Sequence, residues 1–279
     1  RDFYHLVKIF SRQMVDMKKR DIDPHVIENL GALSIERNFG GLRFDGVKNA
    51  TSIEKMKNIF SLTYPNVPVS SKYDVFKRIT ENIKDNESRY LLVISKSSTS
   101  TFLISSILLE LKKNYSFYIG SQFRDDLQNE EYSLKILNKI QMHMEQGNVL
   151  ILKNLESVYP ALYDLFNQNF TEVNKKLYAR IAIGSSNNAF SYVNPQFRCI
   201  VSVDEGKEIE EEPPFLNRFE KHIISFEYLL GENLRKESER IYGILKDLCN
   251  CDKEKTQLKG INYDLRKTLM NNNLDEIQG

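Results

Sequence analysis

The residue whose type and position best suit a chemical role is Arg218, which lies in the segment PPFLNRFEKHIISF at residues 213–226. The two prolines predict a loop before it and the apolar run after it predicts a short buried strand, so Arg218 is expected at a loop-to-strand junction. Its planar fork of donors suits phosphate oxygens. The simpler alternative is a surface arginine paired with Glu220 or with the acidic stretch 208–212.

A phosphate-binding loop is expected, if anywhere, between a predicted strand and helix in LLVISKSSTSTFLIS. Such a loop needs glycines that let backbone N–H groups close around phosphates, then Lys for the terminal phosphates and Ser or Thr for magnesium. When GxxxxGK[ST] is laid over the segment, the required positions hold Ser95, Ser100, Thr101 and Phe102. No element of the motif is present. Lys96 and the hydroxyls could still hold an anion, and a solvated loop is the alternative.

The predicted strand NVLIL also lacks the residues of a nucleotide hydrolase. Two carboxylates should follow it directly, one for magnesium and one to activate water. The chain has Lys153 and Asn154 there, and Glu156 comes two residues late. Because a lysine cannot ligate magnesium, we expect no metal at this strand. Cys249 and Cys251 are too closely spaced, with no nearby histidine, to form a zinc site alone.

Composition narrows the class of protein. The 279 residues carry a net charge of +1 and are 41% apolar, so the chain can bury a core and has no global field that attracts nucleic acid or an anionic membrane. No apolar run approaches the length of a membrane span, and residue 1 begins inside an amphipathic helix rather than a signal peptide. We therefore expect a cytoplasmic or nuclear protein and a piece of a longer chain.

The elements that must position these residues change in character along the chain. Residues 1–62 show helical periodicity, whereas from residue 63 short apolar runs alternate with amphipathic helices. Continuous hydrophobicity in these runs predicts a parallel sheet covered on both faces, that is, an α/β fold. Two apolar arms around GSSNN predict a β-hairpin near 178–193. The expected strands are 89–95, 115–120, 148–152, 197–203 and 222–228, and the expected intervening helices are 102–113, 130–147 and 157–170.

This order of parts resembles the AAA+ (P-loop NTPase-like) core, and more closely one module of the mysterin-type giant RING E3 ubiquitin ligases, which carry a chain of AAA+ units. The resemblance is carried by RDFYHLVK, IERNFGG, ESRYLLVISK, YIGSQFRDD, MEQGNVLILKNLESVYPALYDLFNQNF, FRCIVSVDE and FLNRFEKH. It implies that residues 1–62 are the helical lid of one AAA+ module and residues 63–230 the large core of the next. Residues 231–279 are expected to be a helical segment followed by a loose tail.

The resemblance also assigns roles to two arginines. In AAA+ assemblies an arginine at the start of the last core strand reaches the γ-phosphate of the neighbouring module, and Arg218 occupies the matching position; such a finger is worth on the order of 10³ to 10⁵ in rate. Arg1 opens a lid helix and resembles a sensor arginine for the preceding module, with an exposed terminal arginine as the alternative. ATP and magnesium are then expected in that preceding module, with no cofactor bound by this segment.

Three hypotheses about function follow. The first is a nucleotide-free AAA+ module that acts as a structural and mechanical element of an ATPase stalk in an E3 ubiquitin ligase, with adjacent AAA+ modules of the same chain as partners. The second is a stand-alone protein-binding adaptor of AAA+ ancestry without ATPase activity. The third is an ATPase with a degenerate site that still works. On the first two the segment is not itself catalytic.

Overall fold

The computed structural model describes residues 2–16, 24–40, 59, 74–96, 99–121, 123–127, 129–183, 187–207, 213–224 and 236–244. The chain divides into two compact units, Arg1–Ile223 and Ile224–Gly279. In the second unit, residues 236–244 form a helix. The predicted boundary between lid and core, at residues 62 and 63, lies outside the described residues.

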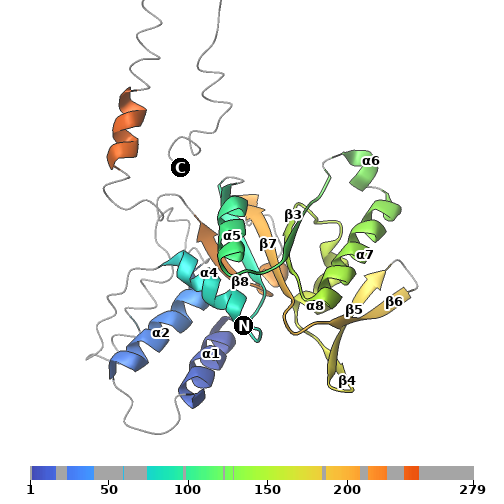
Figure 1. The fold of residues 1–279 in the computed structure, drawn as a ribbon, viewed down its shortest axis with the longest axis horizontal. Helices are drawn as coiled ribbons and strands as arrows, with labels where there is room; N and C mark the ends of the chain where they lie inside the picture. Colours follow the sequence, from blue (N-terminus) through green and yellow to red (C-terminus); the bar gives the residue numbers. More distant parts are fainter. Residues whose placement is uncertain are drawn as a thin grey trace, which may run out of the picture. The chain divides into compact units, whose positions relative to one another are not determined.

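A five-stranded sheet with the order β2-β3-β7-β1-β8 forms the centre of the first unit (Figure 1). Parallel pairing joins β2 to β3, β3 to β7 and β7 to β1. The predicted α/β fold with a central parallel sheet is therefore confirmed. The strands are β1 (Leu91–Ser95), β2 (Tyr115–Ile119), β3 (Val149–Lys153), β7 (Arg198–Asp204) and β8 (Glu220–Ile224).

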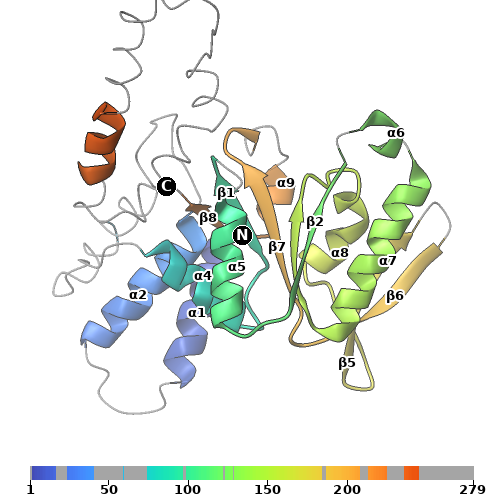
Figure 2. The same cartoon turned by 45° about the horizontal axis from the view of Figure 1, so that its top comes forward.

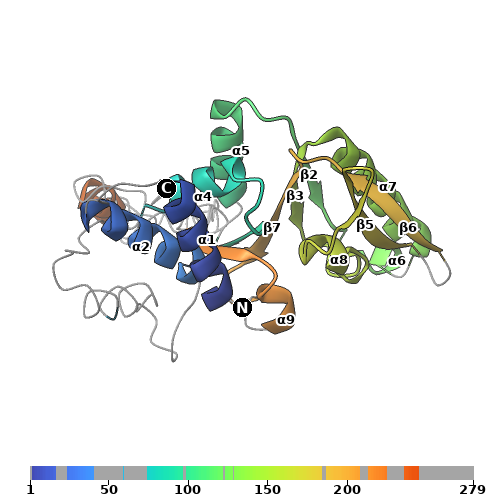
Figure 3. The same ribbon diagram turned by 90° about the horizontal axis from the view of Figure 1, so that it is seen from below.

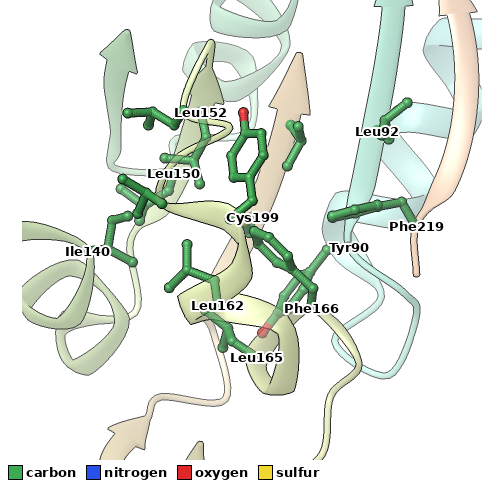
Figure 4. Packing of buried hydrophobic residues seen from close by; sticks show 14 of the residues in the cluster. Tyr90, Leu92, Ile140, Leu150, Leu152, Leu162, Leu165, Phe166, Cys199 and Phe219 are labelled. Carbon is green, nitrogen blue, oxygen red and sulfur yellow. The ribbon is translucent and has the colours of Figure 1, made fainter. Parts of the chain in front are cut away.

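Every residue of β1 and β3 is buried because helices cover both faces of this sheet. One face packs against α7 (Glu130–Gln146), the short helices η1 (Tyr159–Leu162) and α8 (Tyr163–Phe166), and α9 (Pro213–Leu216). Figure 4 shows this core, in which alternate strand residues such as Leu150 and Leu152 meet Ile140 of α7 and Phe166 of α8. On the other face lies α5 (Thr99–Glu110), as Figure 2 shows.

Three helices lie at the β8 side of the sheet: α1 (Asp2–Asp16), α2 (Pro24–Phe39) and α4 (Val75–Lys84). The edge of the Phe3 ring packs on Phe39, with the centroids 5.4 Å apart, which joins α1 to α2. An Asp74 side chain caps α4 by accepting a hydrogen bond from the Lys77 amide. Helices α1 and α2 lie within residues 1–62, which the sequence predicts as helical, whereas the predicted helices do not include α4.

The segment after β3 differs from the sequence prediction. A helix was expected over 157–170, but the chain makes a single turn of η1 and one of α8 and leaves the helix after Phe166. Gln168 then adopts a positive φ of 56°, and the chain enters β4 (Thr171–Val173). The apolar spacing of YPALYDLF is helical, but the following asparagines and glutamine favour a turn.

A second, antiparallel sheet follows, with the order β4-β5-β6. Its long hairpin is formed by β5 (Lys176–Ile183) and β6 (Asn187–Val193), in the region where the sequence predicts a hairpin. Figure 3 shows the hairpin beside α7, at the end of the unit opposite α1 and α2. A short helix α6 (Arg124–Leu127) precedes α7.

Candidate functional site

The carboxyl edge of the sheet brings together the positions at which a nucleotide site would be built. Because β1, β3 and β7 are parallel neighbours, their last residues end at one edge: Ser95 is in register with Asp204, and Lys153 with Ser202. The Lys153 ammonium donates a hydrogen bond of 2.7 Å to Asp204 Oδ1, and the Lys153 side chain is only 11% exposed. A partly buried ion pair therefore bridges β3 and β7 at this edge, with the Asp204 side chain 35% exposed.

A hydrogen bond between two serine hydroxyl groups joins the end of β1 to the start of α5. Ser95 Oγ and Ser100 Oγ are both buried and lie 2.8 Å apart, and the amide of Glu205 donates to the Ser95 carbonyl at 2.8 Å. Thr101 is partly buried in α5, whereas Phe102 is 72% exposed. The hydrogen bond between the two serines fixes the start of α5 to the end of β1.

The turn after β3 is also tightly built. Asn154 has a positive φ of 53°, and the Gly120 amide donates to the Lys153 carbonyl at 2.8 Å. A Cβ on Gly120 would lie 1.5 Å from the carbonyl oxygen of Asn154, so only glycine fits there. In the described part of the chain, no three His, Cys, Asp or Glu side chains are grouped to hold a metal ion.

Arg218 lies between α9 and β8. We call residues 215–219, which include the last two residues of α9, the Arg218 turn. Its amide donates to the Phe215 carbonyl at 3.1 Å, and its guanidinium carbon lies 4.0 Å from the ring centroid of Tyr163. The Nε and Nη1 atoms are buried, and neither has a hydrogen-bond partner among the described residues. Arg218 is thus held by stacking on an aromatic ring, with donors left over.

Glu220, the partner considered for Arg218 from the sequence, is bound elsewhere. Its carboxylate accepts hydrogen bonds from Arg37 Nε and Nη2 at 3.0 and 2.8 Å and from Asn82 Nδ2 at 2.8 Å, and Oε1 lies 3.1 Å from His222 Nε2. The pairing of Arg218 with Glu220 is therefore wrong. The other alternative partner, the acidic stretch 208–212, lies outside the described residues.

The Arg37–Glu220 pair is almost completely buried, with side-chain exposures of 2% and 1%. Burial by itself raises the pKa of Glu220, but the Arg37 charge and the hydrogen bond with His222 outweigh it and leave the pKa well below the usual value. Burial likewise lowers the pKa of Arg37, and the charge of Glu220 outweighs it, so that the pKa of Arg37 is raised. Both groups therefore stay ionised inside the protein.

A second buried cluster holds the Arg218 turn from its other side. Arg89 donates to Asp2 Oδ1 at 2.8 Å and to the Asn217 carbonyl at 3.3 Å, and Lys221 donates to Asp2 and to the Leu216 carbonyl, each at 3.4 Å. The pKa of Asp2 is lowered, because Lys221 and Arg89 together outweigh the effect of burial, which raises it. Sequence reasoning missed both clusters.

Comparison with known proteins identifies the family. The family model described as the RNF213 AAA domain matches residues 80–230, which is more than half of the chain. The chain belongs to the RNF213 AAA domain family. This agrees with the mysterin-type resemblance drawn from the sequence.

Relatives of this RNF213 AAA domain chain are much longer proteins. The chain is 27% identical over 265 residues to human E3 ubiquitin-protein ligase RNF213, covering 89% of this chain and 5% of that protein. It is 30% identical over 215 residues to a putative uncharacterized transmembrane protein of Dictyostelium discoideum, covering 74% of this chain and 4% of that protein. It is 28% identical over 232 residues to E3 ubiquitin-protein ligase rnf213-beta of Danio rerio, covering 80% and 4%. The chain thus spans about a twentieth of the length of these relatives.

The remaining features of this family member are Arg1, its cysteines and the length of its apolar helices. Arg1 and the close pair Cys249 and Cys251 lie outside the described residues. Cys199 is buried in β7, and burial raises the pKa of its thiol to about 12, so it stays protonated and unreactive. None of the described helices is long and apolar enough to cross a membrane.

Proposed function

We propose that this RNF213-type AAA module binds no nucleotide and serves as a structural and mechanical element in the ATPase stalk of an E3 ubiquitin ligase, where Arg218 acts on ATP held by the preceding module. The observation that carries the proposal is the state of Arg218. Its guanidinium is stacked on Tyr163 with two buried donors unused, and no described carboxylate pairs with it. Because Nε and Nη1 are buried, the guanidinium must turn away from Tyr163 to donate to an anion of the preceding module.

The carboxyl edge supports the nucleotide-free part of the proposal. Lys153 occupies the place of a magnesium ligand and already neutralises Asp204. Because the ammonium and the carboxylate already bind each other, the Asp204 carboxylate is not left free as a ligand for a divalent ion. Neither Ser95 nor Ser100 offers the backbone freedom of a glycine.

The experiment that tests the Arg218 role uses a longer chain that includes the preceding module. Arg218→Ala should lower kcat for ATP hydrolysis on the order of a thousandfold, with little change in nucleotide affinity, because the guanidinium matters most when charge develops on the γ-phosphate. Arg218→Lys should restore only part of the rate, since lysine lacks the planar fork. The matched control is Arg180→Ala, which removes a 54% exposed arginine of the hairpin. Unchanged turnover in Arg218→Ala would reject the role.

The nucleotide-free part is tested on the present chain. Calorimetric titration with ATP and magnesium should give no measurable heat of binding, and the melting temperature should not rise with ligand, since only a ligand that binds the folded state stabilises it. A micromolar dissociation constant for ATP or ADP would instead favour an ATPase with a degenerate site.

The protein-binding adaptor remains the second candidate because of one surface feature. On the three-stranded sheet, Phe190 of β6 is 62% exposed and Val173 of β4 is 49% exposed. Exposed aromatic residues are common in protein interfaces. The adaptor would be favoured over the stalk module if Phe190→Ser abolished binding of a protein partner while Arg218→Ala left ATP turnover in the longer chain unchanged.

A further inference from the structure

The turn that carries Arg218 is fixed to the rest of the unit by buried charge on both of its flanks. On the C-terminal flank, Glu220 is the first residue of β8 and binds Arg37 of α2 through two guanidinium nitrogens. On the other flank, Arg89 and Lys221 bind the carbonyls of Asn217 and Leu216. Only Phe219 separates Arg218 from Glu220, so a shift of Glu220 along or out of the sheet moves the guanidinium as well.

The carboxylate of Glu220 binds several side chains from different parts of the unit. Three side chains from three elements converge on its carboxylate: Arg37 from α2, Asn82 from α4 and His222 from β8 itself. Asn82 also accepts a hydrogen bond of 2.6 Å from Arg198 of β7, which ties the cluster to the centre of the sheet. A buried carboxylate with these partners cannot move without breaking several charge-assisted hydrogen bonds.

The cation on α2 has no other strong anchor in the sheet. Arg37 Nη1 reaches Asp85 at 3.2 Å, at the end of α4, and its remaining donors go to Glu220. Glu220 is therefore the point at which α2 meets the strand that follows Arg218. The second cluster repeats this arrangement for α1, because Asp2 of α1 binds both Arg89 and Lys221.

We propose that Glu220 is the positioning residue of Arg218: through its buried ion pair with Arg37 it fixes the Arg218 turn to helix α2, so that the guanidinium moves together with that helix. The catalytic consequence of this proposal rests on the proposed function, whereas the structural consequence does not. A displacement of α2 reaches Arg218 through this ion pair, next to a weaker link in which Asn38 of α2 accepts a hydrogen bond of 2.8 Å from Arg89. Glu220 is not a catalytic residue, because it acts through Arg218.

The chain contains a matched control on the same helix. Glu36 is the neighbour of Arg37, is fully buried, and accepts a hydrogen bond of 2.5 Å from Arg78 Nε. This ion pair joins α2 to α4 and does not involve β8. Glu36→Gln and Glu220→Gln therefore each remove one buried carboxylate that binds an arginine, and we expect only Glu220→Gln to loosen the Arg218 turn.

The structural test is amide hydrogen exchange on the present chain. The amides of Arg218 and Phe219 close the turn by bonding to Phe215 and Leu216. Relative to wild type, Glu220→Gln should speed their exchange by about tenfold or more, and Glu36→Gln by no more than about twofold, once each rate is compared with that of the β3 amides. Equal effects of the two variants would overturn the proposal. If Glu220→Gln does not fold, Arg37→Lys, which keeps the charge but loses the fork, decides in its place, and unchanged exchange in that variant would overturn it too.

The catalytic test is a double-variant cycle in the longer chain that includes the preceding module. Glu220→Gln should lower kcat without changing KM for ATP, and should have no further effect once Arg218 is replaced by alanine. Glu36→Gln should have the same small effect in both backgrounds. A loss from Glu220→Gln that persists in the Arg218→Ala background would overturn the proposal. If Arg218→Ala alone leaves turnover unchanged, the proposed function fails, and the exchange experiment still decides whether Glu220 positions the turn.

Discussion

Replacing Arg37 by methionine should destabilise the protein strongly. The substitution keeps most of the side-chain length but removes the guanidinium that binds Glu220, which is 1% exposed. Glu220 would keep Asn82 and His222 but lose its main counter-charge. Breaking a buried ion pair by removing one partner costs about 3–5 kcal/mol. For a unit of this size, that corresponds to a fall in melting temperature of roughly 6–20 °C.

The measurement is urea unfolding and thermal unfolding of the variant, with Arg12→Met as the control. Arg12 pairs with Asp85, which also binds Arg37, and with Glu87 at 3.0 Å, but its side chain is 25% exposed. Because a solvent-accessible ion pair contributes about 0–1 kcal/mol, the control should lose far less stability than Arg37→Met. Equal losses in the two variants would refute the reasoning, since they would mean that burial of the Arg37–Glu220 pair does not matter.

A double variant separates the value of the pair from the cost of orphaning one partner. In Arg37→Met/Glu220→Leu both charges are gone, and apolar side chains of similar size occupy the space. Replacing both members of a buried pair is often neutral or stabilising, so the double variant should be more stable than Arg37→Met alone. A double variant less stable than the single one would show that His222 and Asn82 depend on the Glu220 carboxylate.

Two further predictions concern pH and packing. Glu220 has a folded pKa below its usual value of 4.5, so the unfolded state binds the proton first, and the free energy of unfolding should fall as pH drops below 4.5. In Glu220→Gln, urea unfolding at a series of pH values should show a smaller fall. An unchanged dependence of the unfolding free energy on pH would contradict the lowered pKa of Glu220. Gly120→Ala places a Cβ 1.5 Å from the carbonyl oxygen of Asn154, so the turn after β3 must shift, at a cost of about 1–3 kcal/mol in urea unfolding, and a neutral result would mean that this turn is not fixed.

The sheet could be predicted from the sequence because its strands are continuous apolar runs. LLVI of β1 and VLIL of β3 are buried on every residue, which is the pattern of a strand covered on both faces. The failure at 157–170 has a local cause. Apolar spacing alone does not show where a helix ends, and the chain leaves α8 at Asn167 and Gln168, where side chains compete for backbone hydrogen bonds.

The buried charge clusters could not be predicted, because their partners lie far apart in the chain. Arg37 and Glu220 are separated by 183 residues, and Asn82 and Glu220 by 138. Periodicity reports only on neighbours within a few residues, so it placed Arg37 in a helix and left Glu220 as a partner for the adjacent Arg218. The available signal was a glutamate next to an apolar strand, since a charge at a buried strand position needs a partner.

Most of the described charged groups at the carboxyl edge of the sheet and around the Arg218 turn are paired within the module, and Arg218 is the exception. This difference bears on whether the module needs a nucleotide itself or acts on the nucleotide of its neighbour. At the edge, Lys153 meets Asp204 and Ser95 meets Ser100, so groups of the module satisfy one another without any ligand. Arg37, Arg89 and Lys221 are also bound within the module. Arg218 alone among these cations has no carboxylate among the described residues, although its turn is held on both flanks. This difference supports the proposal that the module folds without nucleotide and that Arg218 acts on a nucleotide held by its neighbour, because a preorganised donor loses little entropy when it binds an anion.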